Sequence, residues 1–155
     1  MSINLKEEIK QSKPFPSTGA EALLSILRTA TILEHEQNEA LRPYGVTATQ
    51  YNVLRILQGA GDSGLCGREI AERLISKVPD VSRLLDRMDE IELLTRERDP
   101  EDRRHVTARI SEKGRKVLAD ATPALQAVEW KRFKNVDSNA AASLIDALGT
   151  IRNSI

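Results

Sequence analysis

The chain has 155 residues, about the length of one domain, and 40% of them are hydrophobic, which excludes a disordered or collagen-like protein. Its 23 basic and 23 acidic residues give a formal net charge of zero, so binding of a polyanion has to rest on a local cluster. One cysteine, two distant histidines and an acidic N-terminus predict no disulfide, metal site, cofactor, signal peptide or membrane partner, and we expect a cytoplasmic protein.

The first forty residues predict one long helix after a short leader. Residues 1–16 are expected to form an arm or a short helix, because Pro14 and Pro16 prevent a helix from continuing. A capping box at 18–21 and apolar residues at helical spacing then predict a helix over about 18–41. Its apolar stripe is wider than one core-facing surface needs, so we expect part of it to be buried against a second copy in a homodimer.

Three shorter helices follow. A capping box at 47–50 starts a helix that ends near the glycines at 59 and 61, and residues 66–69 start the next one. A break at 76–78 separates it from a fourth helix, in whose first turn we place Pro79. The buried stripe of this fourth helix is expected to comprise Val81, Leu84, Leu85, Met88 and Ile91.

In the last third of the chain the pattern of apolar residues changes from helical spacing to alternation, and then returns to helical spacing. Alternating residues over 94–98 and 106–110 predict a β-hairpin with a charged loop. Ser111 is expected to cap a fifth helix that Pro123 kinks. Asp137 or Ser138 is expected to start a sixth helix, which has an apolar stripe. Two short helices, a break and a hairpin predict a mainly α fold with a small β-hairpin wing, a winged helix-turn-helix.

Five segments carry a more specific resemblance: 46–54, 70–74, 79–88, 98–104 and 110–114. They resemble the MarR family of bacterial transcription regulators over about residues 46–118. The resemblance implies a single domain over 1–155, with residues 1–45 and 111–155 as dimerisation helices and residues 46–110 as a DNA-binding lobe. It also implies a homodimer that binds a pseudo-palindromic double-stranded operator, acting as a repressor that a small-molecule effector releases.

The resemblance also implies which residues face DNA. The fourth helix would lie in the major groove, with Arg104 of the wing in the minor groove, Asp102 orienting it and Arg103 near phosphate. Arginine suits a narrow groove because its planar cation sheds water more readily than an ammonium group does. The residues of the fourth helix that would point toward DNA are Pro79, Asp80, Ser82, Arg83 and Arg87.

Two positions depart from the pattern of the family, and two more are candidates for effector binding. Glu92 and Ile75 stand where family members commonly have glycine, and a left-handed backbone at Glu92 would cost on the order of 1 kcal/mol. The effector would bind between the dimerisation helices and the lobe. Arg28 and Tyr51 are candidates there, because a guanidinium and a phenol suit an aromatic acid.

Other interpretations remain open at this point. The arginines of the fourth helix lie among acidic residues and could form an ordinary solvated helix face. Cys66, at a helix start, could be a thiol sensor, although a lone cysteine is more often a small packing residue. No catalytic motif is present and we expect no enzyme, so the rival function is a dimerisation or protein-docking module, whose binding would depend little on salt.

Overall fold

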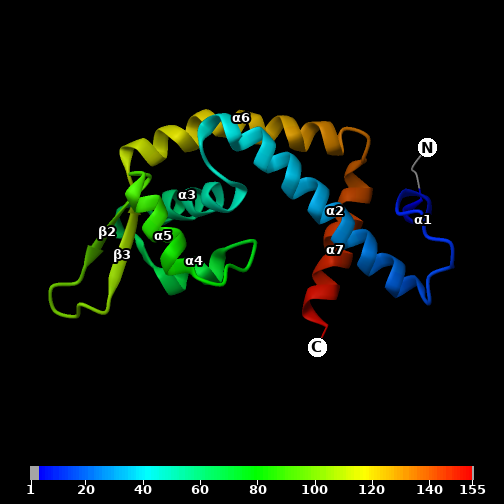
Figure 1. The fold of residues 1–155 in the computed structure, drawn as a ribbon, viewed down its shortest axis with the longest axis horizontal. Helices are drawn as coiled ribbons and strands as arrows, with labels where there is room; N and C mark the ends of the chain where they lie inside the picture. The colour runs from blue at the N-terminus through cyan, green and yellow to red at the C-terminus, as the bar shows by residue number, and fades with distance from the viewer. Residues whose placement is uncertain (1–3, 155) are drawn as a thin grey trace.

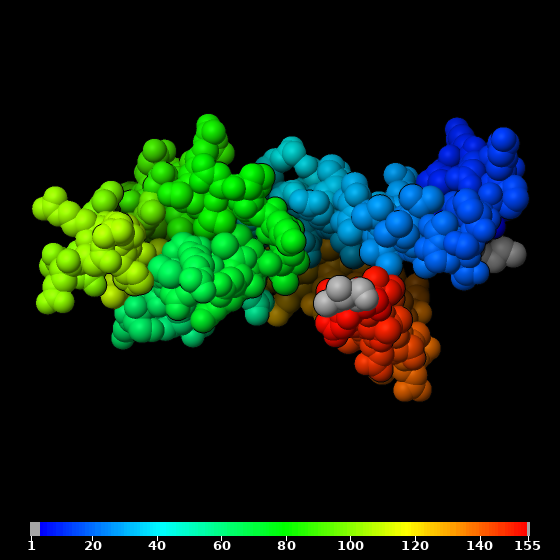
Figure 2. All heavy atoms as spheres, turned by 90° about the horizontal axis from the view of Figure 1, so that it is seen from below, coloured from blue at the N-terminus to red at the C-terminus, as the bar shows by residue number. Residues whose placement is uncertain are grey.

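The computed structural model describes residues 4–154 and has an elongated shape with two regions (Figure 1). At one end lies the winged lobe, residues 46–110. The flanking helices α1 (Leu5–Glu8), α2 (Thr18–Leu41), α6 (Glu112–Phe133) and α7 (Ser138–Asn153) extend from it to the other end, where the N-terminal segment lies (Figures 1 and 2). Within the described part of the chain, no helix is both long and apolar enough to cross a membrane.

The N-terminal region follows the prediction except at one cap. α1 (Leu5–Glu8) is the short leading helix, and α2 (Thr18–Leu41) is the long one. Ser17, not Thr18, caps α2, because its hydroxyl accepts the amide of Ala20 at 3.1 Å. A short 3-10 turn, η1 (Arg42–Tyr44), then redirects the chain, which ends that turn at Gly45 with a φ of 73°.

The lobe begins with two capped helices. α3 (Ala48–Ala60) starts at the reciprocal Thr47–Gln50 capping box that the sequence predicts. After the 3-10 turn η2 (Gly61–Ser63), a strand of two residues, β1 (Leu65–Cys66), leads into α4 (Gly67–Arg73). The amide of Cys66 donates to Glu69 Oε2 at 2.8 Å, which closes the first turn of α4.

The fourth predicted helix starts two residues later than expected. α5 runs over Val81–Glu90, and Asp80 is its N-cap, accepting the amide of Arg83 at 2.9 Å. Pro79 therefore lies outside the first turn, and the prediction that it starts the helix is wrong. The carboxylate of Asp80, one position after Pro79, accepts a free amide at the start of the helix, and proline has no side-chain acceptor that could do so. The break between α4 and α5 therefore extends over residues 74–80.

A Schellman motif ends α5 and aims the chain into the sheet. Glu92 has a φ of 62°, so the left-handed backbone that the sequence analysis considered as a condition at this position is present. The amide of Glu92 bonds to the Asp89 carbonyl and that of Leu93 to the Met88 carbonyl, both at 2.9 Å. Leu93 and Met88 are both buried, which supplies the apolar contact typical of this motif.

The wing is the predicted hairpin with one strand added. β2 (Leu94–Arg98) pairs antiparallel with β3 (Val106–Ile110), with Leu94 opposite Ile110 and Arg98 opposite Val106. β1 pairs with the other edge of β3, so the strand order is β1-β3-β2. The sequence did not predict β1, because two residues are too few to show an alternating pattern.

Two helices complete the fold. α6 (Glu112–Phe133) starts at the predicted Ser111 cap and stays helical on both sides of Pro123. α7 (Ser138–Asn153) starts at Asp137, one of the two predicted starts. α6 packs against both α2 and α3, so it belongs to the lobe at its start and to the flanking helices at its end (Figure 1).

The core lies almost entirely at the lobe end of the molecule. Its fully buried side chains join α3, α4, α5 and the sheet to the last residue of α2 and the first half of α6, and α7 contributes none. The largest of them are Leu41, Leu54, Leu57, Ile70, Leu85, Met88, Leu94 and Val53.

Candidate DNA-binding interface

The outer face of α5 carries three of the side chains that the sequence analysis predicts to face DNA. Ser82, Arg83 and Arg87 are exposed, while Leu85 and Met88 on the opposite face are buried in the core. Asp80 and Pro79 are also exposed, at the N-terminal end of the helix. The carboxylate of Asp80 is engaged as the cap of α5, so its role in this structure is to fix the start of the helix.

A residue that the sequence analysis missed ties the wing to α5. The guanidinium of Arg96, on β2, forms an ion pair with Asp86 on α5. The Arg96 side chain is largely covered, and its Nε has no hydrogen-bond partner among the described residues. A partly desolvated pair across two elements restricts their relative orientation, so Arg96 and Asp86 position the recognition surface.

The loop of the wing is ordered by carboxylates that bind its own backbone. Asp99 Oδ1 accepts the amides of Glu101 at 2.8 Å and Asp102 at 3.3 Å, and these bonds lower the pKa of the Asp99 carboxyl. Asp102 Oδ1 in turn accepts the amide of Arg104 at 3.1 Å. The tip therefore consists of short turns, in which acidic side chains accept the backbone amides that a neighbouring strand would otherwise bind.

Three of the predicted wing residues lie together at this tip. Arg104 has a side chain that is 97% exposed, and its Nε lies 3.7 Å from Asp102 Oδ1. The carbonyl of Arg103 accepts Arg98 Nη1 at 3.3 Å, so Arg98 braces the loop from β2. By contrast, Arg109 is held by Glu97 and the Asp62 carbonyl, and is not free to bind another molecule.

The two surfaces complement each other chemically. α5 is a helix of the size that the major groove admits and carries exposed guanidinium groups. The hairpin of the wing extends beyond the body of the lobe (Figure 1), and Arg104 in its loop is exposed. The ion pair of Arg96 and Asp86 connects α5 to β2 of the wing.

The second candidate site is a cleft of about 830 Å³ between the flanking helices and the lobe. Of the two residues predicted from the sequence, Tyr51 lines this cleft and Arg28 does not. Arg28 instead pairs with Glu8 of α1 at 2.9 Å, toward the other end of α2. The basic residue that the described structure places in the cleft is Arg55, one helical turn after Tyr51 on α3, a spacing that could have indicated it.

Hydrogen bonding determines what Tyr51 can offer. Its hydroxyl lies 2.8 Å from Thr122 Oγ1, which itself donates to the Leu118 carbonyl at 2.7 Å. Because Thr122 has a single hydroxyl proton, Tyr51 is the donor in their bond. Its proton is therefore already used within the chain, and Tyr51 is not a free donor for a carboxylate ligand.

Cys66 lies in the lobe, half-buried, with its amide and thiol directed to the Glu69 carboxylate. These bonds lower the pKa of the Glu69 carboxyl. Over residues 4–154, no three His, Cys, Asp or Glu side chains cluster in a way that could hold a metal ion.

Comparison with known proteins agrees with this geometry. The model of the MarR family matches residues 46–106, which is the winged lobe. The transcriptional regulator MhqR of Bacillus subtilis (strain 168) is 30% identical over 91 residues, which are 59% of this chain and 61% of that protein.

Solved structures extend the likeness to the flanking helices. A MarR transcription factor from Planctomyces limnophilus is 30% identical, with a TM-score of 0.68 over 88% of this chain and 99% of that one. S. aureus MepR, solved as a complex with DNA, shares the fold, with a TM-score of 0.77 at 19% identity over 85% of this chain and 96% of that one. The chain therefore belongs to the MarR family, a family of transcription regulators.

Proposed function

We propose that the protein binds a pseudo-palindromic double-stranded operator as a homodimer, and that it acts as a repressor released by a small molecule. The observation that carries the proposal is the joined pair of α5 and the wing, which present exposed guanidinium groups from a rigid lobe. MepR, which shares this fold, has been solved in complex with DNA.

Within this proposal, α5 enters the major groove. Arg83 and Arg87 lie one helical turn apart on its exposed face, and Ser82 is beside them. Arg83 reads a base edge or the adjacent phosphate, while the exposed Pro79 and the Asp80 cap lie at the end of the helix that approaches the backbone. Arginine is the residue that pairs best with guanine in this groove.

The wing performs a different task. Arg104 enters a minor groove whose electrostatic potential depends on its width, Asp102 orients that guanidinium, and Arg103 lies near phosphate. Because Asp102 binds both the amide and the side chain of Arg104, it restricts the arginine before DNA arrives. Less conformational freedom then has to be lost on binding.

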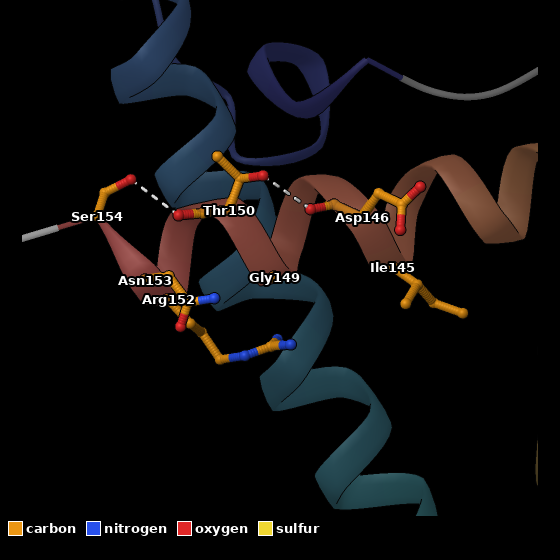
Figure 3. Close-up of a pocket in the computed structure, with 7 residues that line it drawn as sticks. All are labelled: Ile145, Asp146, Gly149, Thr150, Arg152, Asn153 and Ser154. Carbon is orange, nitrogen blue, oxygen red and sulfur yellow. Dashed lines mark hydrogen bonds between the residues drawn. The ribbon is translucent and has the colours of Figure 1, made fainter.

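Exposed apolar side chains on the flanking helices support the homodimer. Large residues of α2, α6 and α7 are exposed in the single chain, and Figure 3 shows the side chain of Ile145 pointing away from α7. The hollow beside it is lined by residues of α7 and by its C-cap Ser154, as expected for one side of an interface. The exposed residues of these helices include Leu23, Leu24, Leu27, Trp130, Phe133, Leu144, Ile145 and Ile151.

The test is a binding series on a duplex that the protein selects from a random pool, followed by fluorescence anisotropy at fixed salt. Arg83→Ala should weaken binding by about 1–3 kcal/mol and relax the preference at particular positions. Arg104→Ala should weaken binding and alter mainly the preference for A/T-rich flanks, and Asp102→Ala should mimic it in part. Arg42→Ala, outside both surfaces, is the matched control.

Salt dependence separates this function from a protein-docking module. Operator affinity should fall steeply as salt rises, since phosphate contacts release counterions, and each lost phosphate contact should reduce the slope by about one. An affinity that is insensitive to salt, together with an unchanged affinity for Arg104→Ala on every duplex, would favour docking of another protein through the lobe.

A further inference from the structure

The cleft beside Tyr51 has a charge balance that opposes the aromatic acid expected from the sequence. Glu34 of α2 and Glu129 of α6 line one wall, and Arg55 of α3 lines the other. Over residues 4–154, none of these three side chains has an ion-pair partner. The cleft therefore carries one net negative charge from groups that are free to interact with a ligand.

The neighbouring basic residues of α6 do not line the cleft. Lys131 and Arg132 follow Glu129 on α6, but both are paired with Glu36 of α2. Arg132 Nε lies 2.6 Å from Glu36 Oε2, and this bond holds the pKa of the Glu36 carboxyl well below its usual range. The two cations nearest in sequence are thus bound elsewhere.

Apolar side chains also line the cleft. Ile75, in the break between α4 and α5, lines it and is 87% exposed, and Phe133 of α6 and Leu125 lie in the same cleft. An isoleucine left this exposed is stabilised when an apolar group covers it. The cleft therefore offers apolar side chains together with the carboxylates of Glu34 and Glu129 on α2 and α6.

Ile75 also connects the cleft to α5. Its amide donates to Asn52 Oδ1 at 2.9 Å, so the break that precedes Asp80 and α5 is attached to α3 at this residue. Asn52 itself lines the cleft. A ligand that covers Ile75 thus contacts the segment that positions the start of the recognition helix.

We propose that the effector of this cleft is a hydrophobic organic cation, whose apolar body covers Ile75 and Phe133 and whose positive group lies by Glu34 and Glu129. The proposal rests on the effector-released function above and names the ligand class of that site. Charge complementarity selects a cation, because a carboxylate ligand meets two unpaired carboxylates and a single guanidinium. Tyr51 gives an acid no compensation, since its proton is donated to Thr122.

The test is calorimetry on the full chain at neutral pH with three probes of matched shape: 2-naphthylmethylammonium, 2-naphthylmethanol and 2-naphthoate. The cation should bind at least about tenfold more tightly than the anion, with the alcohol between them. Ile75→Ser, which keeps the amide bond to Asn52, should weaken all three by a similar factor.

The charge variants show whether the preference comes from this wall. Combined Glu34→Gln and Glu129→Gln substitutions should abolish the preference for the cation, and Arg55→Gln should increase it. Glu112→Gln, an exposed carboxylate at the start of α6 outside the cleft, is the matched control and should leave it unchanged. Tighter binding of the naphthoate, an unchanged preference in the double variant, or no binding of any probe would each overturn the proposal.

A parallel anisotropy measurement keeps this result separate from the proposed function. If the cation binds with the expected preference but operator affinity stays the same in its presence, release by an effector is refuted while the ligand class stands. If operator affinity falls with the naphthoate instead of the cation, the ligand class is refuted while release by an effector stands.

Discussion

The winged lobe and the flanking helices place their apolar side chains in opposite ways. In the lobe, residues such as Leu54 and Leu85 are almost completely buried within the chain. In the flanking helices, Leu27 and Ile145 are more than half exposed, although the helices that carry them are just as regular. Burial in the lobe is completed by one chain, and burial of the flanking helices needs another molecule.

The largest expected effect tests this contrast directly. Leu54→Ala should lower the free energy of unfolding by about 2–5 kcal/mol, because it leaves a cavity in a closed core. Leu27→Ala, its matched control at 55% exposure, should change unfolding little in dilute protein and should instead promote dissociation of the dimer. Urea unfolding at two protein concentrations, with sedimentation, measures both effects.

If Leu27→Ala destabilised the protein equally at every concentration, the flanking helices would be stabilised within one chain. The contrast between the two regions would then be wrong.

The second expected effect concerns the start of α6, where the flanking helices join the lobe. Gly114, in the first turn of α6, is buried so tightly that a Cβ there would overlap the carbonyl oxygen of Leu93. Gly114→Ala should destabilise the lobe by about 1–3 kcal/mol, because the backbones of α6 and the chain entering β2 have to separate. Gly59→Ala, at a glycine with open space around it, is the control. Thermal unfolding of both variants, monitored by circular dichroism, tests this expectation.

The third effect has the opposite sign. Glu92→Gly should raise the free energy of unfolding by up to about 1 kcal/mol, because glycine adopts the left-handed backbone of the Schellman motif without strain. The change should appear in lobe unfolding and leave dimer dissociation unaffected. Denaturant titration of Glu92→Gly beside Glu90→Gly, which lies inside α5 and should destabilise it, gives the comparison.

The smallest effect concerns the contact between α2 and α6. Pairing with Arg132 lowers the pKa of Glu36 from 4.5 to about 2, so the stabilisation is complete above pH 4.5 and is lost as the pH falls from 4.5 toward 2. Glu36→Gln should therefore have a slightly lower Tm than the original chain at pH 7. A difference in Tm that stayed constant down to pH 2.5 would contradict this pairing.

These contrasts also show how far sequence reasoning could reach. Caps such as Thr47 and Ser111 predict helix starts well, because the bonds that they make lie within four residues. The lobe, its wing and the strained Glu92 follow from local motifs. The sequence predicts Pro79 in the first turn because proline is common there, whereas in the structure Asp80 is the N-cap that precedes the first turn. Both residue types are typical of helix starts, so local preference does not decide between the two boundaries.

The candidate sites depended on contacts between distant residues and were predicted less well. Arg28 lies on the correct helix but pairs with Glu8 instead of lining the cleft, and Arg55 lines it in its place. The pair of Arg96 and Asp86 joins a strand to a helix. Periodicity within one element does not determine which side chains of two elements meet.

The unbroken course of α6 has a mechanical consequence. With 22 residues it is about 33 Å long, from the core of the lobe at Gly114 to the exposed Phe133. Pro123, near its middle, has no amide to bond with the carbonyl of Ala119, which makes this the point of least bending stiffness. A bend of about 10° there would move the far end by about 3 Å, since half the helix acts as a lever arm. That displacement is close to the rise of one base pair, so under the proposed function a small flexure of one helix is enough to shift the register of a lobe on its half-site.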